Sequence, residues 1–225
     1  MNTWDKLSMK EKHAFIRTAV KNGLSNLDEI RESYNSFADG GFKPDSATIN
    51  NPIYNANAVN PIYDYMRDKG LTATQAAALM GNLAVESYLN ADLKQIGGPA
   101  YGLIQAEAGR QKAMRSYNTV PYQFGSNLTP EEQQQLNYII DKGINSYTPG
   151  EWGKKGYKGA RDARKAFLNE TDVTKASDII TRNFLRPSKE HINRRRVMSN
   201  YYNQEMKNRF PYNIEDWEYL WKPKK

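Results

Sequence analysis

Cysteine is absent from the sequence, and histidine occurs only twice among 225 residues, as His13 and His191. The absence of cysteine excludes disulfide bonds, cysteine-ligated zinc and a cysteine nucleophile. Two histidines so far apart in the chain provide too little material for a histidine-rich metal site or a serine–histidine triad. We therefore expect a function that uses neither a metal ion nor another cofactor.

Long hydrophobic runs are absent as well. No segment is long and apolar enough to span a bilayer, and the N-terminal stretch MNTWDKLSMKEKHAFIR lacks the apolar centre of a signal peptide. If the protein acts outside the cell that makes it, we expect it to travel in a virion or to leave the host cytoplasm through a membrane hole.

The material for a folded core is present, because apolar residues make up 39% of the chain and aromatic residues 12%. The formal net charge is +7. A basic protein suits a polyanionic partner such as nucleic acid or an anionic cell wall, and a solvated basic surface explains the charge equally well.

Changes in composition divide the chain into four parts. Residues 1–42 are predicted to form a helical hairpin, and residues 43–57, rich in Pro, Asn, Ser and Thr, a linker. Residues 58–205 form the main unit, which is mostly helical in pattern. Residues 206–225 form a short aromatic tail that packs on a neighbour or contacts a partner.

The N-terminal hairpin begins with Ser8 and Glu11, which have the spacing of a capping box. Its second helix places Leu27 and Ile30 on one face. Two short helices also resemble a DNA-binding helix-turn-helix. The second helix contains the acidic stretch LDEIRES, however, which is a poor surface to lay against phosphates. We therefore predict a docking or packing element, and nucleic acid is not the expected partner.

The stretch GLTATQAAALMGNLAVES predicts the central helix of the main unit, with Thr72 and Gln75 as a second capping box. The inward stripe of this helix is expected to consist of Ala76, Leu79, Met80 and Leu83. Glu86 follows on or beside that stripe, at the C-terminal end of the helix. Burial and the negative end of the helix dipole both disfavour an ionised carboxylate there, as suits a general acid. Alternatively, Glu86 leans out to solvent or pairs with a nearby Lys or Arg.

An ordered series of motifs around Glu86 resembles the phage tail lysozyme family, within the lysozyme-like superfamily. The motifs are MGNLAVES, YLNAD, YGLIQ and GRQKAM, followed by PEEQQQLNYIIDKG and DVTKASDIITRNFLRPSKEHINRRRVMSNYYN. Single motifs are weak, whereas the ordered set over residues 58–205 is fairly specific. The resemblance implies a lysozyme-like helical domain around a cleft, with a small irregular or β element beside the cleft. With the N-terminal hairpin, the expected fold class is mainly α.

The resemblance also implies cleavage of peptidoglycan glycan strands by a phage-encoded muramidase. Carried over by position, Glu86 is the general acid at the β-1,4 bond between N-acetylmuramic acid and N-acetylglucosamine, and Ser87 beside it orients the carboxyl group. Tyr101, Gly102 and Gln105 of YGLIQ would line the cleft. Glycine lets the backbone approach a sugar closely, and glutamine offers both a donor and an acceptor.

The sequence departs from the family pattern after Gln105, where a Trp is common and Ala106 and Glu107 stand here. Tyr117 is a candidate for a replacement sugar-stacking surface. A second catalytic carboxylate would be Asp92 or Glu107; alternatively, Asp92 belongs to a helix-terminating cap and Glu107 is a surface residue. A lytic transglycosylase needs one acid/base only, because the 6-hydroxyl of the substrate closes on the anomeric carbon. Hydrolysis and transglycosylation both stay open.

Three consecutive arginines, Arg194 to Arg196, would fan out over more than half of a helix, so we expect at least one to face inward. The expected partners are bacterial peptidoglycan and, through the N-terminal hairpin, a phage tail or capsid protein. Two other functions stay open. One is a catalytically inactive relative that binds the wall or forms a virion part, and the other is a nucleic-acid-binding protein.

Overall fold

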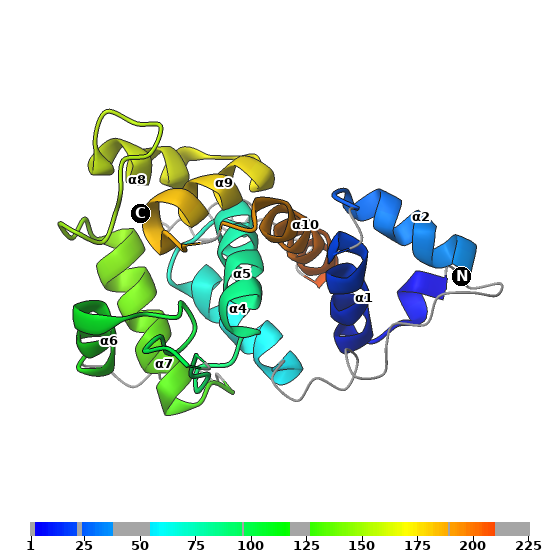
Figure 1. The fold of residues 1–225 in the computed structure, drawn as a ribbon, viewed down its shortest axis with the longest axis horizontal. Helices are drawn as coiled ribbons and strands as arrows, with labels where there is room; N and C mark the ends of the chain where they lie inside the picture. The colour runs from blue at the N-terminus through cyan, green and yellow to red at the C-terminus, as the bar shows by residue number, and fades with distance from the viewer. Residues whose placement is uncertain are drawn as a thin grey trace, which may run out of the picture.

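The computed structural model describes residues 3–21, 24–37, 55–95, 97–117, 127–188 and 190–209. This part of the chain is mainly α-helical, as predicted (Figure 1). Two isolated antiparallel bridges, Lys94 with Tyr101 and Tyr101 with Ala106, form the small β element expected after the glutamate helix. The helices are η1 (Thr3–Lys6), α1 (Met9–Lys21), α2 (Leu27–Phe37), η2 (Ala56–Ala58), α4 (Val59–Asp68), α5 (Ala73–Ser87), α6 (Ala108–Arg115), α7 (Pro130–Asn137), η3 (Tyr138–Asn145), α8 (Ala160–Asn169), α9 (Val173–Ile180), η4 (Thr181–Leu185) and α10 (Ile192–Arg209).

Helix α5 is the centre of the main unit. It begins with the predicted capping box, in which the Thr72 side chain accepts a hydrogen bond from the Gln75 backbone and the Gln75 side chain accepts one from the Thr72 backbone. All residues from 75 to 84 are buried. The prediction of a single inward stripe was therefore wrong in extent, because α4, α9 and α10 enclose the helix on several sides (Figure 1). A helix enclosed in this way needs no polar face.

Helices α5 and α10 approach each other closely at Gly81. A methyl group at Gly81 would lie 2.3 Å from the backbone nitrogen of Ser199, so the contact requires glycine. The Ser199 hydroxyl donates to the backbone carbonyl of Ala78 at 3.3 Å and to the Ser177 hydroxyl at 3.0 Å. Buried hydrogen bonds thus join α5, α9 and α10 around one point of the core.

The N-terminal helices α1 and α2 lie beside α10 at one end of the molecule (Figure 1). The predicted capping box is present, since the Ser8 backbone donates to the Glu11 carboxylate at 2.8 Å and the Glu11 backbone donates to the Ser8 hydroxyl at 3.3 Å. Phe15, Ile16 and Ile30 are buried in the same apolar cluster as residues of α5 and α10. These helices therefore pack on the main unit through their apolar faces.

Ion pairs reinforce this packing at the far end of α10. Glu205 of α10 lies 3.2 Å from the ammonium of Lys12 in α1 and 3.8 Å from the guanidinium of Arg31 in α2. A packing role for the two N-terminal helices is therefore visible, whereas docking to a partner stays a prediction.

Most of the predicted linker and tail lies outside the described residues, which include only positions 55–57 of the former and 206–209 of the latter. The boundaries of the four predicted parts stay predictions. In the described ranges, every helix is too short or too polar to cross a membrane.

Candidate functional site

Glu86 lies in the last turn of α5, with 13% of its side chain exposed. Its Oε1 accepts a hydrogen bond at 2.8 Å from Nη2 of Arg195, whose side chain is only 2% exposed. The contact with an arginine that the sequence left open is therefore present, and the role of Glu86 as a general acid stays a prediction.

Arg195 is held in one orientation by its other two nitrogens. Nε donates to the backbone carbonyl of Glu190 at 2.7 Å, and Nη1 donates to Oδ1 of Asn82 at 3.1 Å. That oxygen also accepts from the Thr181 hydroxyl at 2.7 Å. The guanidinium therefore fixes Oε1 of Glu86, and among the described residues none donates a hydrogen bond to Oε2.

The chain turns sharply where α5 ends. Tyr88 (φ 56°) and Leu89 (φ 59°) both adopt the left-handed conformation, which is uncommon for residues other than glycine. Leu89 is buried, and the guanidinium of Arg17 in α1 lies 4.5 Å from the centre of the Tyr88 ring. The turn that follows Glu86 is thus held by the core on one side and by the N-terminal helices on the other.

Ser87, predicted to orient the Glu86 carboxyl group, is buried. Its hydroxyl donates to the backbone carbonyl of Leu83 at 3.1 Å, which binds it to its own helix. A contact of Ser87 with substrate stays a prediction.

Tyr101 is the first residue of the loop predicted to line the cleft, and its side chain is buried. Its hydroxyl donates to Oε1 of Glu131 at 2.7 Å, and the guanidinium of Arg115 lies 4.0 Å from the ring centre. Burial, and then the hydrogen bond to Glu131, raise the pKa of Tyr101 above its ordinary value, so the phenol stays protonated at neutral pH.

Gly102 and Gln105 give this loop its shape. Gly102 has φ 79°, and a methyl group there would lie 2.3 Å from Oε1 of Gln135. That amide oxygen accepts from the Leu103 backbone at 2.7 Å. The Gln105 amide nitrogen donates to the carbonyl oxygens of Leu93 at 3.1 Å and Gly102 at 2.9 Å. The two predicted substrate-binding residues therefore also hold the loop closed on itself.

The other predicted site residues lie around this loop. Asp92 is exposed, and its backbone donates to Oδ1 of Asn90 at 2.9 Å, as in the turn considered from the sequence. Glu107 is exposed at the N-cap of α6. Tyr117 packs edge-on against Tyr138, with ring centres 5.8 Å apart. In the described chain, no hydrogen bond or ion pair joins Asp92 or Glu107 to Glu86.

Sequence reasoning missed three residues that support these groups: Arg195, Glu131 and Arg115. Of these three, only Arg195 had a signal in the sequence, since it lies in the run of arginines that was expected to contain an inward-facing side chain. Within the described ranges, no three His, Asp or Glu side chains lie close enough together to hold a metal ion.

The chain was compared with models of protein families. Residues 57–206 match the family model described as phage tail lysozyme. The matched range contains Glu86, Arg195 and the loop from 101 to 106. No match was found among curated proteins or among solved structures.

Proposed function

The chain belongs to the phage tail lysozyme family, and from that premise we propose that it is a phage-encoded enzyme that cleaves peptidoglycan glycan strands. The bond we assign is the β-1,4 bond between N-acetylmuramic acid and N-acetylglucosamine, with Glu86 as the general acid. One observation carries this proposal. Glu86 is a partly exposed carboxylate at the end of a buried helix, Arg195 fixes its Oε1, and among the described residues none donates a hydrogen bond to its Oε2.

The chemistry follows from this arrangement. A general acid gives its proton to the glycosidic oxygen as the bond to the anomeric carbon breaks. Oε2 of Glu86 is the oxygen available for that proton. When the proton leaves, the carboxylate that forms already faces the Arg195 guanidinium at 2.8 Å. Arg195 would then stabilise charge that develops in the transition state without having to move.

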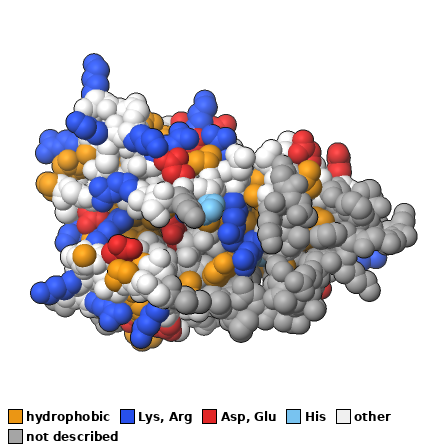
Figure 2. Space-filling view, in the orientation of Figure 1, with side chains coloured by type: hydrophobic (Ala, Val, Ile, Leu, Met, Phe, Trp, Pro, Cys, Tyr) orange, Lys and Arg blue, Asp and Glu red, His pale blue; other side chains and the backbone are white. Residues whose placement is uncertain are grey.

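The predicted substrate-binding residues complete the proposal. Tyr101, Gly102 and Gln105 belong to one closed loop after the glutamate helix, and Tyr117 would offer a ring to a sugar face. The basic surface suits a wall polymer whose peptides carry carboxylates, and Lys and Arg side chains are spread over the face seen in Figure 2.

The family placement gives a phage-associated location, and we propose that the enzyme reaches the wall from a virion or at host lysis. Attachment to a tail or capsid protein through α1 and α2 belongs to the same proposal. Because Phe15, Ile16 and Ile30 are already buried against the main unit, such a partner would have to use the outward faces of these helices.

The role of a second carboxylate separates two chemistries. With Asp92 or Glu107 as partner, water attacks and the product has a reducing end. With Glu86 acting alone, the 6-hydroxyl of the muramic acid residue attacks and the product has an anhydro end. Mass spectrometry of the released fragments distinguishes the two, because the hydrolysed fragment is heavier by one water molecule.

The test of the function is the Glu86→Gln variant on purified sacculi. We expect clearing of turbidity to fall by at least about 100-fold, since general acid catalysis contributes typically 10²–10⁴-fold. Glu29→Gln is the matched control, because Glu29 is an exposed glutamate of α2. Full activity of folded Glu86→Gln would refute the assignment. Absence of clearing by the unmodified protein would favour an inactive relative, in which the Glu86–Arg195 pair is structural only.

A further inference from the structure

A pocket of about 310 Å³ is lined by residues of α9 and η4 and of the segments before α8 and α9. Its wall combines one aromatic ring and one aliphatic side chain with basic, acidic and amide groups. This volume is at the lower end for ligand sites, large enough for a few amino-acid residues. The lining residues are Lys155, Gly156, Tyr157, Glu170, Lys175, Asp178, Ile179, Arg182 and Asn183.

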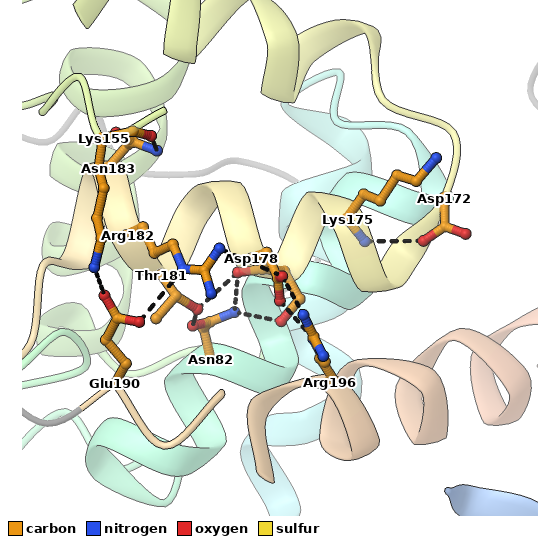
Figure 3. Close-up of polar contacts among 11 residues, drawn as sticks. Asn82, Lys155, Asp172, Lys175, Asp178, Thr181, Arg182, Asn183, Glu190 and Arg196 are labelled. Carbon is orange, nitrogen blue, oxygen red and sulfur yellow. Dashed lines mark hydrogen bonds and ion pairs between the residues drawn. The ribbon is translucent and has the colours of Figure 1, made fainter. Parts of the chain in front are cut away.

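Most of the charged groups in this region already pair with each other. Figure 3 shows Glu190 between Lys155 and Arg182, and both contacts are ion pairs. Asp178 lies between Arg182 and Arg196, and Arg196 holds it through two hydrogen bonds. These pairs form a frame of charged side chains along the border of the pocket.

Two charged groups of opposite sign remain available within that frame. Lys175 of α9 and Glu170 before it both line the pocket, and in the described chain neither forms an ion pair. The Glu170 carboxylate accepts backbone hydrogen bonds from Thr171 and Asp172 through Oε1, which leaves Oε2. A ligand that carries both a carboxylate and an ammonium group would therefore find one partner for each.

Asn183 gives an independent indication of a ligand. It is 1% exposed and lines the pocket, and its Oδ1 is buried without a hydrogen-bond partner. Its amide nitrogen donates to the Lys155 backbone carbonyl at 3.3 Å. A buried acceptor without a donor is costly, so it suits a bound amide or ammonium group.

The pocket connects to the proposed general acid through two residues. Glu190, whose carboxylate pairs with Lys155 and Arg182, has its backbone carbonyl bound to Nε of Arg195 at 2.7 Å, and Arg195 in turn pairs with Glu86. Hydrogen bonds through the buried Arg195 thus link Glu86 to the residue that pairs with the cations of the pocket.

From these contacts we infer that the pocket binds the peptide stem of peptidoglycan, a short peptide that carries carboxylates and an amine or amide. This inference rests on the proposed function and names the part of the substrate that the pocket recognises. Lys175 takes a stem carboxylate, Glu170 and Asn183 take the amine or amide, and Tyr157 and Ile179 cover the aliphatic part.

Two other ligand classes fit the pocket less well. A neutral sugar would leave Lys175 and Glu170 without charged partners, although the Tyr157 ring could stack on it. A phosphate or nucleic acid would find a partner in Lys175 but would leave the Glu170 carboxylate without a cationic group. A stem peptide satisfies both signs of charge at once.

The experiment compares sacculi with intact stems and glycan strands from which an amidase has removed them. Lys175→Glu reverses the unpaired charge in the pocket. Lys165→Glu is the matched control, because Lys165 is an exposed lysine of α8 outside the pocket and its replacement changes the net charge equally. The measurement is kcat/KM for release of fragments from each substrate. Binding of the free tetrapeptide stem to the full-length Glu86→Gln protein is followed by calorimetry as a readout independent of cleavage.

We expect the unmodified protein to prefer stem-bearing strands roughly tenfold, and Lys175→Glu to lose roughly fivefold on those strands only, as one ion pair of about 1 kcal/mol would give. Lys165→Glu should stay within about twofold on both substrates. Equal cleavage of both substrates, or equal loss on both in Lys175→Glu, would overturn the inference. Absence of all cleavage refutes the proposed function instead, and peptide binding that Lys175→Glu abolishes would still support the pocket.

Discussion

The Glu86–Arg195 pair makes a quantitative prediction, because the structure specifies what each side chain loses. Arg195→Met removes hydrogen bonds to Glu86, Asn82 and Glu190 and leaves a carboxylate that is only 13% exposed without its counter-charge. Removing one partner of a buried ion pair costs about 3–5 kcal/mol, and we expect that loss in the free energy of unfolding. Adding Glu86→Gln removes the unpaired charge, so the double variant should be about 2 kcal/mol more stable than the sum of the single effects predicts.

The assay is urea unfolding at pH 7, followed by circular dichroism, for the four proteins of the cycle. The Lys155–Glu190 pair is the control cycle, since its side chains are 64% and 30% exposed and its coupling should stay below about 1 kcal/mol. If Arg195→Met does not fold, Arg195→Lys, which keeps the positive charge, takes its place in the cycle. Additivity within about 0.5 kcal/mol in the Glu86–Arg195 cycle would refute the reasoning, because it would mean that the pair contributes nothing specific in solution.

Three further predictions concern the loop, the N-terminal helices and pH. Gly102→Ala places a methyl group 2.3 Å from the Gln135 side chain at φ 79°, so we expect about 1–3 kcal/mol of destabilisation by thermal unfolding, and an unchanged Tm would contradict this. Glu205→Gln leaves Lys12, 9% exposed, without its carboxylate, which should cost about 1–3 kcal/mol, whereas no loss would show that the N-terminal helices are not held by this pair. Burial, followed by two nearby arginines, lowers the pKa of His13 well below its ordinary value. The unfolded chain then binds a proton that the fold excludes, so stability should fall by up to about 1.4 kcal/mol per pH unit below about pH 6.5, and His13→Gln should flatten the slope. Identical slopes for both proteins would disprove the His13 contribution.

Local signals predicted the helices well. The boxes Ser8–Glu11 and Thr72–Gln75 depend on side chains three residues apart, so the sequence alone reveals them. The π-helical turns η3 and η4 could not be predicted in this way, because distant packing sets them. In η3, the backbone carbonyl of Gly143 accepts from the Trp152 indole at 2.7 Å, and a methyl group on Gly143 would lie 2.6 Å from Phe184. The stripe prediction for α5 fell short for the same reason, since the neighbours that enclose it come from other parts of the chain.

In the candidate site too, residues with a local sequence signal could be predicted, whereas contacts between distant parts of the chain could not. Glu86 was identifiable because its helix and its motif are local. Its partner was not, because 109 positions separate Glu86 from Arg195. The run from Arg194 to Arg196 predicted an inward-facing arginine but not which one, since that depends on the rotation of α10 against α5. Similarly, the contact of Tyr101 with Glu131 joins residues 30 positions apart and had no signal in the sequence.

The close approach at Gly81 has a consequence for how the site tolerates change. Arg195 lies one helical turn before Ser199 on α10, and Glu86 lies five residues after Gly81 on α5, so the separation of the two helix axes determines whether guanidinium and carboxylate meet. Any side chain at position 81 would push Ser199 away and lengthen the ion pair. A substitution at Gly81, which lies between two helices and away from substrate, would therefore lower the measured activity just as a change in the active site would.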